Sequence, residues 1–388
     1  MKTYFFIACL LSLLVQNVFA QKKSRHSNVL PNYNNSLLLE SMPDTTANIS
    51  LGDLDGDGHL DIVLAKGRHW PMIDRVMLGD GHGKIKKAYD LSKVADRSYT
   101  SGMADFNGDG FLDIAVSNDN PDKKLVYLND GEGNFSIGSE FGNPDWPTRN
   151  LSIADINNDG LPDIILANRG EIGNTSNYVC LNQGRGKFSG DCIAVAPYPA
   201  TTIFPTDINK DGFIDLVTPF RDSGQSYVYL GGAGASFSDA QRIPFGPATA
   251  AIRMASVADI NADGLPDIVT VDEFKGVDIY FGQKDKTFSG GISIADAKVI
   301  PYALALADMN KDGYIDIVVG HVQAPSAVYF NDGTGHNFTP VWFGDDHGTV
   351  CGIALGDFNE DGTLDIGMGR SGAISVIYFG SDKKKNSK

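Results

Sequence analysis

The sequence predicts an all-β fold, a seven-bladed β-propeller of four-stranded antiparallel blades, and three observations lead to it. One acidic nine-residue pattern occurs seven times in the 388 residues, starting at positions 53, 105, 155, 207, 259, 308 and 357. The copies are therefore 49 to 52 residues apart, a period typical of propeller blades and longer than most solenoid repeats. Short apolar segments flank the copies, and no stretch of useful length has a helical pattern.

Each blade is expected to repeat one order of strands. An alternating segment such as 152–154 precedes the acidic copy, and a β-branched apolar segment such as 164–166 follows it. We interpret these segments as two strands joined by the acidic loop. A third strand ends in a glycine-rich turn, clearest at 128–135, and a fourth strand leads to the next copy.

The two ends of the chain indicate how the ring closes. Residues 36–42 form a predicted strand before the first copy, and residues 374–379 form a third strand with no fourth strand after it. We expect these segments to pair, because pairing hides a sheet edge that would otherwise promote aggregation. The prediction is one propeller domain at 36–381, a flexible segment at 21–35 and a Lys-rich tail at 382–388.

The acidic copies have the pattern D-x-[DN]-x-D-G-x-x-D. Side-chain oxygens at positions 1, 3, 5 and 9, a backbone carbonyl at position 7 and a glycine at position 6 match a calcium loop. Turn formation alone explains single copies but not seven with identical spacing. We therefore predict up to seven structural calcium ions rather than magnesium, which tolerates such multi-carboxylate cages poorly. The predicted ligands are Asp53, Asp55, Asp57, Asp61, Asp105, Asn107, Asp109, Asp113, Asp155, Asn157, Asp159, Asp163, Asp207, Asn209, Asp211, Asp215, Asp259, Asn261, Asp263, Asp267, Asp308, Asn310, Asp312, Asp316, Asp357, Asn359, Asp361 and Asp365.

With these repeats, residues 36–381 resemble the FG-GAP/VCBS repeat propellers, which are related to the integrin α-chain head. The resemblance implies a propeller whose calcium loops are structural. It does not imply one function, because the family includes adhesins, lectin-like modules and enzymes.

Charge and the N-terminal segment bear on location and partners. A formal net charge of −16 argues against non-specific nucleic-acid binding, which requires cationic side chains. Residues 1–20 are predicted to be a signal peptide, because Lys2 precedes an apolar stretch at 4–15 and Ala20 suits cleavage. That stretch is too short to cross a bilayer. We expect a secreted monomer, extracellular or periplasmic, without a transmembrane segment.

Two cysteines are placed to form a disulfide. Cys180 and Cys192 flank the turn at 184–186 symmetrically and would face each other across a hairpin. The alternative is two unpaired thiols in neighbouring strands. Cys351 lies in an apolar stretch, which favours a buried small side chain over a nucleophile.

The face opposite the acidic loops is predicted to bind ligand. Seven of the 11 arginines fall in its loops, beside aromatic residues. Guanidinium groups with aromatic rings suit carboxylated or sulfated sugars, although arginines in loops are often simply solvated. The sequence thus favours a binding module for an anionic polysaccharide or another extracellular partner. The candidate ligand-binding residues are Arg68, Trp70, Arg149, Arg169, Arg221, Arg253 and Arg370.

Two other functions stay open. A polysaccharide lyase that cleaves uronic-acid glycans by β-elimination would need a base beside a cationic group. No spacing ties the available groups together, and no hydrolase, zinc-protease or phosphate-loop motif occurs, so a catalytic role is less favoured. A protein-binding adhesin would use the same face without catalysis. The candidate catalytic residues are His69, His321, His347, Tyr99 and Tyr302.

Overall fold

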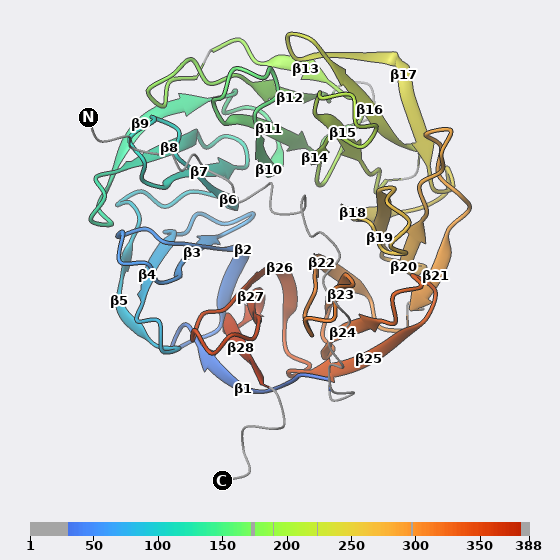
Figure 1. Cartoon of the computed structure of the whole chain (residues 1–388). Helices are drawn as coiled ribbons and strands as arrows, with labels where there is room; N and C mark the ends of the chain where they lie inside the picture. The colour runs from blue at the N-terminus through green and yellow to red at the C-terminus, as the bar shows by residue number, and fades with distance from the viewer. Residues whose placement is uncertain (1–29, 172–174, 189, 223, 296–297, 382–388) are drawn as a thin grey trace, which may run out of the picture.

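The computed structural model describes residues 30–171, 175–188, 190–222, 224–295 and 298–381. These residues form 28 strands that surround a central axis as a ring (Figure 1). The predicted signal peptide and the Lys-rich tail lie outside the described residues. Within the described ranges no helix has the length and apolarity needed to cross a bilayer.

The strands follow one another in groups of four. The first group is β2 (Asp44–Gly52), β3 (Asp61–Lys66), β4 (Arg75–Gly79) and β5 (Ile85–Asp90). The second is β6 (Ser98–Ala104), β7 (Asp113–Asn118), β8 (Lys124–Asn129) and β9 (Phe135–Phe141). The third is β10 (Thr148–Ala154), β11 (Asp163–Asn168), β12 (Asn177–Cys180) and β13 (Ile193–Val195). The fourth is β14 (Phe204–Thr206), β15 (Asp215–Thr218), β16 (Ser226–Gly232) and β17 (Ser236–Phe245).

The remaining groups complete the ring. The fifth is β18 (Ile252–Ala258), β19 (Asp267–Asp272), β20 (Gly276–Tyr280) and β21 (Ile292–Ala295). The sixth is β22 (Pro301–Ala307), β23 (Asp316–His321), β24 (Ser326–Asn331) and β25 (Phe338–Phe343). The last is β26 (Thr349–Gly356), β27 (Asp365–Ala373), β28 (Val376–Ser381) and β1 (Asn32–Leu38).

Hydrogen bonding confirms the predicted all-β fold of four-stranded antiparallel units. Five groups are separate sheets, while the first and last groups join into one eight-stranded sheet because β2 also pairs with β27. In each group the first strand lies nearest the axis and the fourth at the rim (Figure 1). The loops after first strands, which hold the acidic copies, therefore lie on the opposite face from the loops after second strands.

The N-terminal strand closes the ring, at bounds that differ from the prediction. β1 pairs antiparallel with β28, and Ser36 lies opposite Tyr378. The strand covers Asn32–Leu38, so the predicted strand at 36–42 was placed four residues too late, and part of the segment at 21–35 is ordered. Polar residues form this rim strand because much of it is exposed, and the Asn32 side chain donates to the Ser381 carbonyl at 3.1 Å. Tyr33 supplies its apolar contact, 5.1 Å from the Phe343 ring.

A bulge interrupts most of the inner strands at the same place. Registers skip one residue between Ser98 and Thr100, between Thr148 and Asn150, and in the corresponding inner strands β2, β18, β22 and β26. A bulge re-aims the extra side chain away from the ladder. The skipped residue is always six positions before the first Asp of the acidic copy. The skipped residues are Ala47, Tyr99, Arg149, Arg253, Tyr302 and Cys351.

The last Asp of each acidic copy ties its loop to the sheet. The Asp113 carboxylate accepts the backbone N–H of Phe106 at 3.0 Å and that of Asn129 at 2.8 Å. The same pair of bonds occurs in all seven copies. The Asn129 side chain also donates to the Leu54 carbonyl in the preceding group at 2.7 Å. These bonds hold every loop at a fixed place and link neighbouring sheets.

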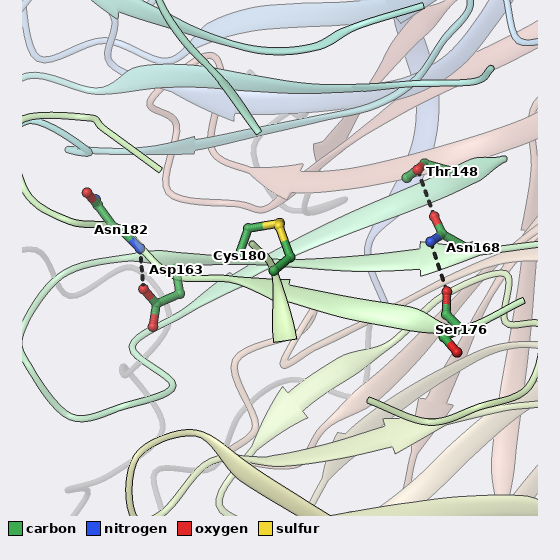
Figure 2. The surroundings of a disulfide bond; sticks show 7 residues. Thr148, Asp163, Asn168, Ser176, Cys180 and Asn182 are labelled. Atoms are coloured by element: carbon green, nitrogen blue, oxygen red, sulfur yellow. Dashed lines mark hydrogen bonds between the residues drawn. A yellow bond between two sulfur atoms is a disulfide. The ribbon is translucent and has the colours of Figure 1, made fainter. Parts of the chain in front are cut away.

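The structure contains the predicted disulfide between Cys180 and Cys192, with Cα atoms 4.3 Å apart (Figure 2). Val179, next to Cys180, pairs with Ile193, so the two cysteines lie across β12 and β13. Asn182, two residues further on, donates its backbone N–H to Asp163 (Figure 2). The disulfide therefore fastens the outer edge of the third group close to its acidic loop.

Candidate functional site

One pocket gathers most of the predicted ligand-binding residues. It lies where the inner strands meet the loops after the second strands, on the face opposite the acidic loops, and has a volume of about 150 Å³. We call it the arginine pocket. It is lined by Ala47, Asn48, Arg68, His69, Tyr99, Thr100, Arg149, Asn150, Arg169, Thr201, Thr202, Arg221, Arg253, Met254, Tyr302, Leu304, Cys351, Gly352 and Ile353.

The bulges of the inner strands supply the wall of the arginine pocket. All six skipped residues line it, and Thr201 lies at the same offset before the fourth acidic copy. The Thr201 hydroxyl oxygen is buried without a hydrogen-bond partner among the described residues. Each repeat therefore presents one side chain to the pocket from an equivalent position, and the differences among these side chains give the pocket its chemistry.

Two of the wall arginines are held by carboxylates and lie against tyrosine rings. Arg253 donates to Glu273 at 2.9 Å, and its guanidinium lies 3.3 Å from the centroid of the Tyr302 ring. Arg149 forms an ion pair with Asp119 and lies 4.6 Å from the centroid of the Tyr99 ring. Carboxylate and ring fix each guanidinium in place, because both attract its positive charge.

Two loop arginines have carboxylate partners as well. Arg221 donates to Glu273 at 2.7 Å, so this carboxylate serves two arginines. Arg169 donates to both oxygens of Asp222, at 3.0 and 2.8 Å, nearer to solvent. Five arginines and the three carboxylates Asp119, Asp222 and Glu273 leave a net charge of +2 at the pocket of an acidic protein.

Arg68 differs from the other four arginines of the pocket. It donates to the Tyr302 hydroxyl at 2.8 Å and to the Cys351 sulfur at 3.5 Å, and across the described chain it has no carboxylate partner. Its guanidinium lies 5.8 Å from the ring centroids of both Tyr99 and Tyr302. Its backbone φ is 55°, a left-handed conformation that only a few per cent of non-glycine residues adopt. Arg68 therefore presents a half-buried positive charge that no acidic side chain neutralises.

His69 and Tyr99 form the one contact between predicted catalytic residues that the described structure contains. The Tyr99 hydroxyl lies 2.9 Å from Nε2 of His69, and Asp119 lies 3.7 Å from Nδ1. Burial and the neighbouring Arg149 and Arg68 lower the pKa of His69, which keeps the imidazole neutral near pH 7. Burial raises the pKa of Tyr99. This pair has the composition of a proton-transfer site beside two arginines.

Four other candidates lie outside the lining of the arginine pocket. Trp70 is 65% exposed, and its ring centroid lies 5.9 Å from that of His69. Arg370 is buried, donating to Asp345 and the Ile374 carbonyl, which is a structural role. His321 is buried, and its ring nitrogen lies 2.8 Å from the Pro325 carbonyl. His347 is exposed and lies 3.6 Å from Asp345.

Sequence reasoning did not single out Thr201, Asp119 or Glu273. The two carboxylates occupy one equivalent position, 14 residues after the first Asp of their acidic copies, where Arg169 and Arg221 stand in other repeats. Aligning the repeats by their acidic copies would have revealed both this column of charges and the column of bulge residues. The information lay in comparing equivalent positions across the repeats rather than in any single residue.

The acidic loops are tight turns held by hydrogen bonds to their own side chains. In the second loop Asp105 accepts the N–H groups of Asp109 and Gly110, at 3.1 and 2.8 Å, and Asn107 accepts that of Asp109 at 2.8 Å. These bonds fold the loop back onto its first Asp, so that positions 1, 3 and 5 lie in one tight turn. Without an ion, burial raises the pKa of Asp113 at position 9 to about 6, and repulsion from the other carboxylates of its loop adds to the shift.

Two observations test whether a cation fits these loops. The position 3 oxygens Oδ1 of Asp55 and Asn209 are buried and have no hydrogen-bond partner in the part of the chain that the structure describes. In the first loop, Asp53, Asp55 and Asp61 offer carboxylate oxygens within 4.8 Å of one another. An unpaired buried oxygen beside clustered carboxylates is what a calcium loop leaves when no ion is present.

Fold and loops together define a β-propeller built from acidic-loop repeats. A sequence model of the FG-GAP-like repeat matches six windows, each spanning two consecutive acidic copies: 53–116, 105–166, 155–218, 207–270, 259–319 and 308–368. The chain therefore belongs to the FG-GAP-like repeat family. Integrin alpha-3 from Mus musculus is 26% identical over 154 residues, 34% of this chain and 14% of the integrin, and integrin alpha-3 from Cricetulus griseus gives 25% over the same length. The chain thus spans about 14% of these relatives.

Solved structures support the fold. The chain is similar to BBS1N, crystallised in complex with ARL6DN, with a TM-score of 0.59 and 11% identity over 93% of this chain and 100% of that chain. It is similar to Saccharomyces cerevisiae Sqt1, with a TM-score of 0.57 and 9% identity over 90% and 100%. The Dos1 propeller gives a TM-score of 0.54 and 10% identity over 91% and 96%. At these identities the likeness concerns the fold alone.

Proposed function

We propose that this protein is a secreted, calcium-stabilised binding module that takes an anionic group of an extracellular polysaccharide in the arginine pocket. The single observation that carries the proposal is Arg68, a half-buried guanidinium without a carboxylate partner among the described residues, in a pocket with net positive charge. A partly buried charge is costly to desolvate unless an opposite charge meets it. A carboxylate or sulfate of a ligand would supply that charge.

The surroundings of Arg68 suit a sugar as well as an anion. Tyr99 and Tyr302 line the pocket, each with its ring centroid 5.8 Å from the Arg68 guanidinium, and the exposed Trp70 contacts the ring of His69, which also lines it. Aromatic faces pack against the apolar face of a sugar ring while a guanidinium pairs with its acidic substituent. An acidic protein partner would find the same charges, and is the alternative ligand.

The acidic loops are proposed to hold calcium as a structural ion. Support comes from the clustered oxygens of the first loop and from the unpaired oxygens of Asp55 and Asn209. Calcium accepts several carboxylate and carbonyl oxygens in flexible geometry, as these loops offer. The proposed ions lie on the face opposite the arginine pocket, so their role would be to stabilise the blades rather than to contact the ligand.

Secretion is proposed from two features. The apolar segment at 4–15 suits an export signal, and the disulfide between Cys180 and Cys192 suits an oxidising compartment. Calcium is also abundant enough outside cells to occupy sites of moderate affinity.

One observation favours a second candidate function, β-elimination of a uronic-acid glycan. The Tyr99 hydroxyl lies 2.9 Å from Nε2 of His69, and the Arg149 guanidinium lies 4.6 Å from the centroid of the Tyr99 ring. In such a reaction the arginine would neutralise the uronate and the Tyr–His pair would accept the proton of the adjacent carbon. Elimination would form a carbon–carbon double bond as the glycosidic oxygen leaves.

A panel of uronic-acid, sulfated and neutral glycans, incubated with the calcium-loaded protein, tests both functions. Binding of acidic glycans that is weakened in Arg68→Gln, without ultraviolet absorbance from an unsaturated uronate, supports the binding module. Absorbance that grows with time and is lost in Tyr99→Phe supports the lyase. The control is Arg75→Gln, because Arg75 pairs with Asp90 outside the lining of the pocket. If every acidic glycan fails to bind, the proposed ligand is wrong.

A further inference from the structure

The first acidic loop has one more carboxylate at its ligand positions than each of the other six. It has Asp55 at position 3, where the other loops have asparagine. At positions 1, 3, 5 and 9 the first loop therefore has four carboxylates, and each of the others has three. The asparagines at position 3 are Asn107, Asn157, Asn209, Asn261, Asn310 and Asn359.

A lysine meets this additional carboxylate. Nζ of Lys86, on β5, lies 2.9 Å from Oδ2 of Asp55 and forms a shorter contact with Asp57 at position 5. Lys86 follows Ile85, the residue that pairs with the end of the third strand. In four other groups the residue at the position equivalent to Lys86 is serine or threonine. These residues are Ser136, Ser238, Ser289 and Thr339.

The additional carboxylate of Asp55 and the positive charge of Lys86 compensate each other. With Lys86 included, the ligand positions of the first loop have the same net charge of −3 as those of a loop with asparagine at position 3. The ammonium takes up oxygens at positions 3 and 5, both of which a divalent cation would use as ligands. An ion entering this loop would therefore displace the lysine or be repelled by it.

Lys86 nevertheless does not occupy every candidate cation-binding oxygen of the first loop. Oδ1 of Asp55 is buried without a partner in the described ranges, and Asp53 and Asp61 offer oxygens nearby. The loop thus retains part of a cation site, with a fixed positive charge at its edge. Competition of this kind lowers affinity rather than abolishing it.

We propose that Lys86 is a built-in cation of the first acidic loop, which consequently binds calcium more weakly than the other six loops and keeps its shape when the ion leaves. This inference rests on the proposal that the loops bind calcium. The first loop also contacts the last one, through His59 and Glu360. The two groups that it links are those that close the ring by strand pairing. The closing junction would thus depend least on calcium.

Native mass spectrometry after removal of free calcium tests the inference by counting retained ions. We expect six ions in the natural protein and seven in Lys86→Ser, which gives the first group a small hydroxyl residue like that of four other groups. Lys87→Ser is the matched control, because Lys87 lies next on β5 and contacts the Tyr89 ring, with Nζ 4.7 Å from its centroid. It should retain six.

Any other number of retained ions would contradict the proposal. Seven ions in the natural protein, or six in Lys86→Ser, would overturn the role of Lys86 and leave calcium binding intact. No ions in any variant would overturn calcium binding itself. Melting temperature in chelator gives a second readout: Lys86→Ser should melt earlier than Lys87→Ser, because four carboxylates then lack any cation. Equal melting temperatures would contradict the proposal.

Discussion

Replacing Asp113 by alanine separates the tethering role of position 9 from calcium ligation. Asp113 is fully buried, and its two oxygens accept backbone N–H groups of Phe106 and Asn129. Alanine leaves both donors buried and unpaired, at about 1–3 kcal/mol each, so the free energy of unfolding should fall by roughly 2–6 kcal/mol. Because these bonds need no ion, the loss should persist in chelator.

The control variant is Asp109→Ala, at position 5 of the same loop. Asp109 accepts only bonds within its exposed loop, from the Phe111 N–H at 3.0 Å and the Asn107 amide at 2.8 Å. Denaturant unfolding should show a loss within about 1 kcal/mol in chelator and a larger loss with calcium present. If Asp113→Ala and Asp109→Ala unfold alike in chelator, position 9 is not a tether and the reasoning is refuted.

Three further predictions concern pH, closure and the disulfide. Burial raises the pKa of Asp316 and of Asp365 to about 7, so protons compete with the calcium ion for these carboxylates. Calcium affinity measured by calorimetry should therefore fall as the pH drops from about 7.5 to 5.5. An affinity that is independent of pH would contradict this prediction. Deleting residues 21–38 removes β1 and should cause aggregation that light scattering detects, because the edge of β28 is then open. Deleting residues 21–31 leaves β1 in place and should not cause aggregation. Equal behaviour of the two deletions would mean that β1 is dispensable. The Cys180→Ser/Cys192→Ser variant should lose about 3 kcal/mol or less in denaturant unfolding, the chain-entropy value for so short a loop, and non-reducing peptide mapping that finds both thiols free in the natural protein would contradict the bond.

The sequence predicts the fold well because the acidic copies mark the same point in every blade. Asp113 and its six equivalents are identifiable by spacing alone, and the strands on either side follow from their apolar pattern. The limits of β1 were less predictable, because a rim strand is half exposed and Asn32 and Ser36 carry little apolar signal. Pairing with β28 fixes these limits, and pairing partners are distant in the sequence.

The arginine pocket was predictable as a face but not as a set of contacts. Arg149 and Arg253 were expected there, but their partners were not: Asp119 reaches Arg149 from the neighbouring group, and Glu273 reaches Arg253 from the loop after the next strand of the same group. Arg370 was expected there too, but it lies within β27 and turns into the sheet, where the Ile374 carbonyl and Asp345 accept its N–H groups. Side-chain direction at a bulge follows from strand register, which composition and spacing do not specify.

Calorimetric titration of the natural protein and of Arg68→Gln with an acidic oligosaccharide tests the central claim most directly. A charge-assisted hydrogen bond to a partly buried group contributes about 1.5–3 kcal/mol, so the substitution should weaken binding roughly 10- to 150-fold. Arg75→Gln, which removes an arginine paired with Asp90 outside the lining of the pocket, should bind as the natural protein does. Unchanged affinity in Arg68→Gln, or equal losses in both variants, would contradict binding at the arginine pocket.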